Sequence, residues 1–136
     1  MQIFSEAWAV RCGDLLRSSS AYRDASAAWE GDLVFRILPV PDGPAAYFDL
    51  WHGDCRAVRP ATTHDLASAR YVIEGAADVW QQVLQGRLVP LLALMTGRMK
   101  LVRGRIPELV PHANSAKELL TVMSRIEVTF PGGLSD

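Results

Sequence analysis

The stretch ADVWQQVLQGRLVPLLALMTGRMKLVRG, residues 77–104, decides the fold of this chain. Apolar residues at three- and four-residue steps predict a helix that ends at Gly86, because glycine readily adopts the positive φ found after many helices. Pro90 suits the first position of a second, short helix, which is apolar nearly all the way round and ends at Gly97. From there to Gly104 apolar and basic residues alternate, which predicts a strand.

The rest of the chain predicts helices at both ends with strands between them. A first helix follows Ser5, and a second, short helix ends at Gly31. In the last helix Ser115 and Glu118 have the spacing of a capping box, and an apolar stripe follows them to Ile126. Alternation with period two predicts strands at about residues 33–38, 46–52, 55–59, 71–74 and 98–103.

This order of elements predicts an α+β fold in one domain, residues 1–136. We expect a five-stranded, largely antiparallel sheet with helices packed mainly on one face. A turn is expected at the prolines and glycine of residues 39–44, and a short helical turn between the third and fourth strands. Residues 128–136 are expected to form a frayed tail.

Composition excludes several classes of function. The chain is 49% hydrophobic and 21% charged with a net charge of −1, so it lacks the basic balance of a nucleic-acid-binding protein. Its two cysteines are too few for a disulfide scaffold. The longest apolar run, residues 88–95, is well short of the ~20 residues that span a bilayer. We therefore expect a cytoplasmic protein without a transmembrane segment.

The segment LWHGDCR, residues 50–56, raises the question of a thiol nucleophile. A two-residue turn at Gly53-Asp54 would place His52 and Cys55 opposite each other, with Cβ atoms about 4.5–5.5 Å apart. No orienting third group or oxyanion donor accompanies them, so we expect Cys55 to pack as a small hydrophobe. His52, Cys55 and His64 also lack the spacing of a metal-binding motif. No catalytic residue, metal or cofactor is therefore expected.

The residues Gly86-Arg87-Leu88, Pro90, Met95-Thr96-Gly97-Arg98 and Gly104 recur together at offsets typical of one family. In this pattern the chain resembles the sterol-carrier-protein domain, the sterol-binding domain of nonspecific lipid-transfer proteins. The tight match covers about residues 71–104. The resemblance implies an apolar tunnel between sheet and helices that carries a lipid, a fatty-acyl group or another apolar small molecule, without catalysis by the domain itself.

The tunnel implies a set of candidate binding residues. Its apolar candidates are Trp80, Val83, Leu84, Leu88, Leu91, Leu92, Met95, Met99, Leu101, Leu119, Leu120 and Met123. Candidates for a polar head group are Arg98, Lys100 and Arg103. Two alternatives stay open: a small enzyme or enzyme accessory that uses Cys55 and His52 on a hydrophobic substrate, and an interaction module whose apolar groove takes a partner. Homodimerisation and transient membrane contact stay open as well.

Overall fold

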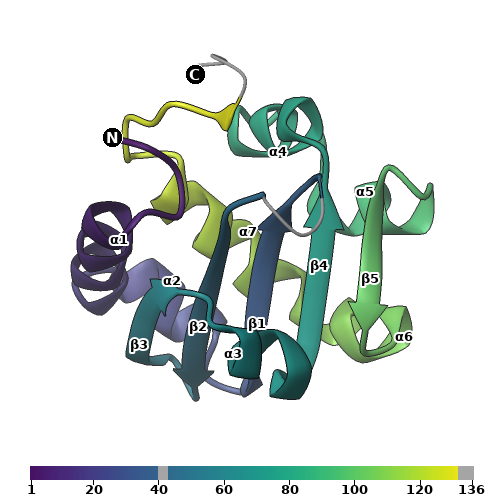
Figure 1. Ribbon diagram of the computed structural model, residues 1–136. Helices are drawn as coiled ribbons and strands as arrows, with labels where there is room; N and C mark the ends of the chain where they lie inside the picture. The colour runs from purple at the N-terminus through teal and green to yellow at the C-terminus, as the bar shows by residue number, and fades with distance from the viewer. Residues whose placement is uncertain (40–42, 132–136) are drawn as a thin grey trace.

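The computed structural model describes residues 1–39 and 43–131 and contains one five-stranded sheet, in the order β3-β2-β1-β4-β5 (Figure 1). Strand β1 pairs antiparallel with β2 and parallel with β4, and the other two pairings are antiparallel. The predicted α+β fold with a largely antiparallel sheet is thus confirmed. The strands are β1 (Glu30–Ile37), β2 (Ala45–Trp51), β3 (Asp54–Pro60), β4 (Tyr71–Gly75) and β5 (Met99–Arg103).

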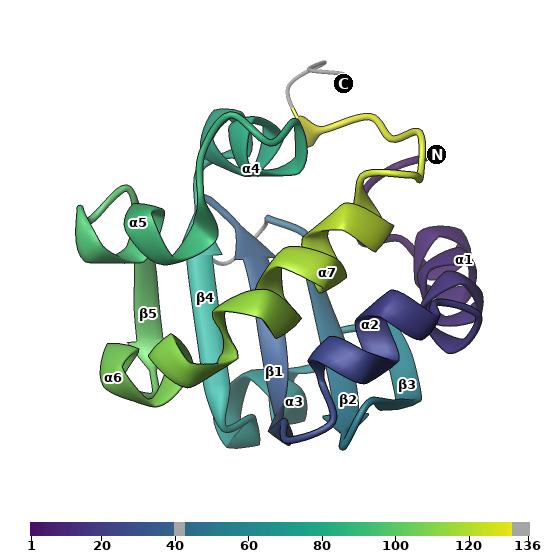
Figure 2. The same ribbon diagram turned by 180° about the vertical axis from the view of Figure 1, so that it is seen from behind.

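Most helices cover one face of the sheet, as predicted (Figure 2). Helix α7 crosses that face diagonally, with α1 and α2 to one side of it and α4 and α5 to the other. Helix α3 lies on the opposite face (Figure 1). The helices are α1 (Glu6–Arg17), α2 (Ser20–Ala25), α3 (Thr63–Ser68), α4 (Ala77–Leu84), α5 (Pro90–Met95), α6 (Ile106–Leu109), the 3-10 turn η1 (Val110–His112) and α7 (Ala113–Met123).

Local sequence signals begin and end these helices. The Ser5 hydroxyl accepts a hydrogen bond from the backbone N–H of Trp8 and so caps α1. Pro90 occupies the first turn of α5, where its missing N–H costs nothing. Gly86 and Gly97 adopt φ of +76° and +77° just after α4 and α5, which is the conformation that their predicted role requires.

An aromatic cluster fills the space between α1 and the sheet. We use this name for Phe4, Trp8, Phe35, Phe48 and Trp80, all of them buried. The ring of Trp8 meets that of Phe4 edge-on at a centroid distance of 5.0 Å and that of Phe48 at 6.1 Å. Such edge-to-face pairs stabilise the fold beyond the burial of their apolar area, and they hold the rings in fixed orientations.

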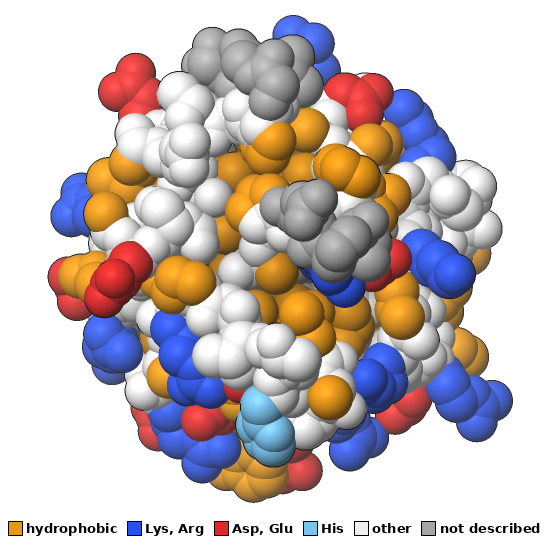
Figure 3. All heavy atoms as spheres, in the orientation of Figure 1, with side chains coloured by type: hydrophobic (Ala, Val, Ile, Leu, Met, Phe, Trp, Pro, Cys, Tyr) orange, Lys and Arg blue, Asp and Glu red, His pale blue; other side chains and the backbone are white. Residues whose placement is uncertain are grey.

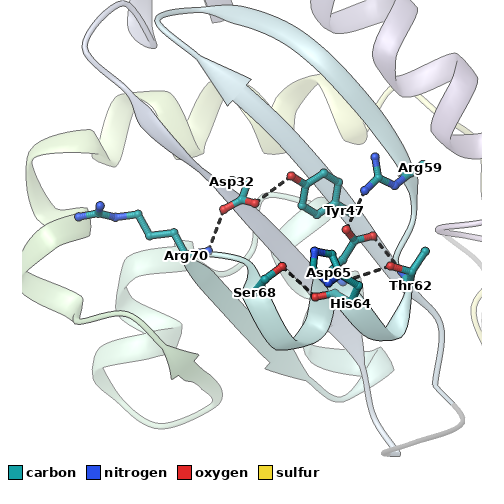
Figure 4. A network of polar contacts seen from close by, with 8 residues as sticks. All are labelled: Asp32, Tyr47, Arg59, Thr62, His64, Asp65, Ser68 and Arg70. Atoms are coloured by element: carbon teal, nitrogen blue, oxygen red, sulfur yellow. Dashed lines mark hydrogen bonds and ion pairs between the residues drawn. The ribbon is translucent and has the colours of Figure 1, made fainter.

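The opposite face of the sheet is held by polar contacts (Figure 4). Asp65 of α3 is buried and accepts hydrogen bonds from the backbone N–H of Thr62 at 2.9 Å and from Arg59 at 2.7 Å. Burial alone would raise the pKa of Asp65, but these hydrogen bonds outweigh it and lower the pKa. The Tyr47 hydroxyl donates to Asp32 at 2.8 Å. Figure 3 shows apolar side chains at the centre of this face and charged ones around them.

Two local expectations from the sequence are wrong. Helix α7 begins at Ala113, so Ser115 does not cap it; its hydroxyl instead lies 2.6 Å from that of Ser26, the residue that caps the end of α2, and both are buried. The expected frayed tail does not begin at residue 128, because Val128 and Phe130 are buried and Thr129 forms a parallel bridge with Gln2. Residues 132–136 of that tail and residues 40–42 of the predicted turn lie outside the described residues.

Candidate functional site

A cavity of about 570 Å³ lies between the helix-covered face of the sheet and helices α4, α5 and α7. Strands β1, β2, β4 and β5 supply its floor. Residues just before α5 and just before α7 complete its wall. The lining is dominated by aliphatic and aromatic side chains, and its volume falls within the ~300–1,000 Å³ of small-molecule sites. The arrangement is therefore suited to hold an apolar molecule.

Sheet register places the floor of the cavity. Leu33 and Phe35 of β1 lie beside Tyr71 and Ile73 of β4, and side chains two apart on a strand share a face. Met99 of β5 joins them, because it pairs with Gly75 at the end of β4. With Leu50 of β2, the floor therefore runs across the four neighbouring strands β2, β1, β4 and β5.

Gly75 gives Trp80 and Met99 the room to meet over the end of β4. A Cβ atom at position 75 would lie 3.2 Å from the indole nitrogen of Trp80 and 3.3 Å from the Met99 methyl carbon, tighter than most real contacts. The indole N–H of Trp80 donates to the carbonyl of Arg36 at 3.0 Å, and its ring centroid lies 4.9 Å from that of Phe35. Trp80 is thus held in place where the aromatic cluster meets the cavity.

The structure brings most of the predicted apolar residues to this cavity. Those that line it are Trp80, Val83, Leu84, Leu88, Leu91, Met99, Leu119 and Leu120. Four predicted residues do not line it: Leu92 and Met95 are exposed on α5, Met123 is buried elsewhere in the core, and Leu101 is half-buried on β5. Apolar type alone does not give the direction of a side chain on a short helix that is apolar all round.

The predicted head-group residues do not reach the cavity. Arg98 donates to the side chain of Gln82, and Arg103 donates to the carbonyls of Leu66 and Ala69 at 2.9 and 2.8 Å. Lys100 lies on β5 between Met99 and Leu101, so it points to the other face of the sheet. Among the described residues that line the cavity, Lys117 of α7 is the sole lysine or arginine, and it is exposed.

Sequence reasoning missed one end of the cavity. There Trp29 packs between Tyr71 and His112, with ring centroid distances of 5.3 and 5.0 Å. The parallel pairing of β1 with β4 brings these residues together, and period-two alternation gives no partner for a strand. Ser115 also lines the cavity, next to the buried Ser26 hydroxyl.

The hairpin between β2 and β3 does not form the predicted turn. His52 and Gly53 are its central residues, with φ of +51° and +87°, so Trp51 and Asp54 flank it instead of His52 and Cys55. The His52 ring lies 2.7 Å from the carboxylate of Glu30. Burial raises the pKa of the Cys55 thiol, which keeps it protonated near neutral pH. The geometry therefore does not pair this thiol with a base.

Residues 1–39 and 43–131 contain neither a metal-binding cluster nor a membrane-spanning helix. No group of three or more histidine, cysteine or acidic side chains there is arranged to hold a metal ion. Within the same residues, no helix has both the length and the apolar character needed to cross a membrane.

Comparison with known proteins agrees with this architecture. A crystal structure of a sterol carrier protein 2 is 42% identical, with a TM-score of 0.83 over 92% of this chain and 99% of that one. A solution structure of a conserved hypothetical protein from Thermus thermophilus, titled as possibly a sterol carrier protein, is 41% identical, with a TM-score of 0.82 over 97% of this chain and 94% of that one.

A more distant structure shares the fold. The sterol carrier protein 2 of Aedes aegypti, solved in complex with palmitate, is 15% identical, with a TM-score of 0.55 over 90% of this chain and 98% of that one. The comparison with curated proteins finds no match. The model of the SCP-2 sterol transfer family matches residues 13–102. The chain that builds this sheet, this helical layer and this cavity belongs to the SCP-2 sterol transfer family.

Proposed function

We propose that this protein binds and carries a long-chain fatty acid, or an apolar molecule of similar shape, in the cavity between the sheet and helices α4, α5 and α7. The observation that carries the proposal is the cavity itself, about 570 Å³ and lined mainly by apolar side chains. The palmitate held by the Aedes aegypti relative gives the class of ligand to try first.

Energetics support an occupied cavity. Closed, dry cavities cost about 24 cal/mol per Å³, so 570 Å³ would cost about 14 kcal/mol if it were sealed and empty. That equals the whole stability of a typical domain, roughly 5–15 kcal/mol. The space is therefore filled by solvent or by a ligand, and an acyl chain that replaces solvent gains about 0.8 kcal/mol for each buried CH₂.

The polar residues of the cavity suggest where a carboxylate would lie. Lys117 is exposed and lines the cavity, with Asn114 and Thr121 as its exposed neighbours in the lining. A carboxylate at this rim would keep its charge in water while the acyl chain enters the apolar interior. This arrangement replaces Arg98, Lys100 and Arg103 as the proposed partners of the head group.

We propose carriage without catalysis. The raised pKa of Cys55 and the pairing of His52 with Glu30 support this part of the proposal. A Cys55→Ala variant is expected to bind palmitate with unchanged affinity. If the Cys55→Ala variant keeps its fold but loses palmitate binding, the enzyme hypothesis would be favoured instead.

The direct test is a palmitate titration followed by the emission of Trp29 and Trp80, which both line the cavity, together with native mass spectrometry. We expect saturable binding of one palmitate. Lys117→Gln should weaken palmitate about fivefold and leave 1-hexadecanol unchanged, because an exposed ion pair contributes under about 1 kcal/mol. Lys100→Gln is the matched control. Absence of a palmitate complex in both measurements would overturn the proposal.

A further inference from the structure

An exposed apolar stripe runs along α5. Val89, Leu92 and Met95 are 61%, 50% and 64% exposed. They follow one another at three-residue steps, which places them on one side of the helix, while Ala93 and Leu94 are buried on the other. Three large apolar side chains in a row, one on the N-cap residue and two on the six-residue helix, form an exposed apolar patch. We call Val89, Leu92 and Met95 the α5 stripe.

The α5 stripe is continuous with the rim of the cavity. Val89 belongs to the stripe and also lines the cavity, as do its helix neighbours Pro90, Leu91 and Leu94. Whatever covers the stripe therefore also borders the cavity at this end.

The segment around the stripe is strongly basic. Between Asp78 and Glu108 the sequence holds five cations and no acidic residue, although the whole chain has a net charge of −1. Arg103 is engaged with backbone carbonyls and Arg98 with Gln82. Arg87 and Arg98 are exposed and lie just before and just after α5 in the chain, whereas Lys100 points to the other face of the sheet. A patch with this charge is complementary to an anionic surface.

We propose that the α5 stripe docks on an anionic lipid bilayer, with Arg87 and Arg98 facing the lipid phosphates. The inference rests on the proposed function, since the docked face would direct the cavity rim toward the lipids that supply or receive the ligand. Exposed apolar side chains beside cations combine the two forces that hold a peripheral protein on a bilayer, namely apolar burial in the interface and attraction to anionic head groups.

A protein partner fits this surface less well. A standard protein interface takes about 800 Å² from each partner, and three side chains of a six-residue helix cover only a small part of that area. A bilayer needs no shape-matched surface, so a short stripe with basic flanks suffices.

The test is co-sedimentation of the whole protein with large unilamellar vesicles of phosphatidylcholine containing about 30% phosphatidylserine. Leu92→Glu/Met95→Glu replaces two stripe residues that do not line the cavity, and we expect at least about tenfold weaker vesicle binding. Val10→Glu on α1 is the matched control, because Val10 is 60% exposed on another helix. It should change vesicle binding by less than about twofold.

A charge variant tests the second half of the proposal. Arg87→Gln/Arg98→Gln should weaken binding to the anionic vesicles about fivefold for each cation removed and leave the weak binding to pure phosphatidylcholine unchanged. Added salt should weaken the binding of the natural protein in the same way, because salt screens exposed charges.

Palmitate titration without vesicles keeps the two proposals apart. If the stripe variants bind palmitate normally but lose vesicles, docking through α5 is supported. If they bind vesicles like the natural protein, the docking proposal is overturned while ligand carriage stands. If sedimentation velocity instead shows that the stripe mutations split a dimer and leave vesicle binding intact, a second copy of the chain covers the stripe and the bilayer proposal fails.

Discussion

The two ends of the helical layer pack against the same sheet face in different ways. Where α1 lies on the sheet, Trp8 packs its ring against Phe4 and against Phe48 of β2 and is 1% exposed. Where α4, α5 and α7 cross β1, β4 and β5, aliphatic and aromatic side chains line a cavity of about 570 Å³. Both ends are apolar, and Phe35 and Trp80 belong to the aromatic cluster and also line the cavity. The difference teaches that side-chain size and the approach of each helix decide whether an apolar layer becomes a core or a binding site.

The largest expected effect is the loss of stability when a leucine is replaced by alanine at each of the two ends. Leu16→Ala in α1 removes a fully buried side chain from the filled end and should lower the free energy of unfolding by about 4 kcal/mol. Leu120→Ala only enlarges a cavity that already exists. Its free energy of unfolding should therefore fall only by the cost of exposing the lost apolar surface to water, about 2 kcal/mol. Urea unfolding measures both, and equal losses would remove the distinction between the two ends.

The converse substitution adds volume. Ala9→Phe in α1 overpacks the filled end and should cost about 2–3 kcal/mol in the free energy of unfolding. Ala116→Phe places the same ring in the cavity and should change stability by less than about 1 kcal/mol. The cavity variant should instead lose palmitate affinity by at least about 100-fold, read from the tryptophan emission. A severely destabilised Ala116→Phe would show that the cavity end is already packed.

The pH dependence of stability sharpens the comparison further. Burial raises the pKa of the Cys12 thiol at the filled end, and the nearby Cys55 adds to the shift. Folding therefore disfavours the thiolate, so this contribution to stability is complete below the ordinary pKa of about 8.5 and is lost as the pH rises above it. Relative to Cys12→Ala, the natural protein should lose up to about 1.4 kcal/mol per pH unit there. A Leu120→Cys thiol, facing the cavity, should give a shallower slope.

The smallest expected effect lies at the boundary of the two ends. Ser26 and Ser115 share a hydrogen bond of 2.6 Å between α2 and α7. Ser115→Ala leaves the Ser26 hydroxyl buried without this partner and should cost about 1 kcal/mol. The double variant Ser26→Ala/Ser115→Ala should recover most of that loss, which a double-mutant cycle measures. Additive losses would mean that the two hydroxyls are not coupled.

Much of the architecture could be predicted from the sequence because its signals are local. The positive φ of Gly86 and Gly97, the place of Pro90 in α5 and the alternation in β1 each depend on a few neighbouring residues. The family resemblance around residues 86–104 supplied the cavity, which no periodicity would have given.

The parts that could not be predicted depend on distant contacts. The parallel pairing of β1 with β4 creates the end of the cavity around Trp29 and Tyr71. Ser115 looks like a helix cap in sequence, yet its partner is 89 residues away. Leu92 and Met95 share the apolar type of Leu91 and Leu94, and only the packing of α5 decides which of them face the cavity.

The parallel bridge between Gln2 and Thr129 holds the first and the last described segments of the chain side by side. The backbone N–H of Ile3 donates to Thr129 at 3.0 Å, and the N–H of Thr129 donates to Met1 at 2.8 Å. Gln2 and Thr129 are both exposed, so a donor and an acceptor fluorophore attached to them would transfer energy efficiently while the protein is native. Unfolding would let the dyes move apart to the average end-to-end distance of an unfolded chain, giving a readout of global stability from two labels that do not line the cavity.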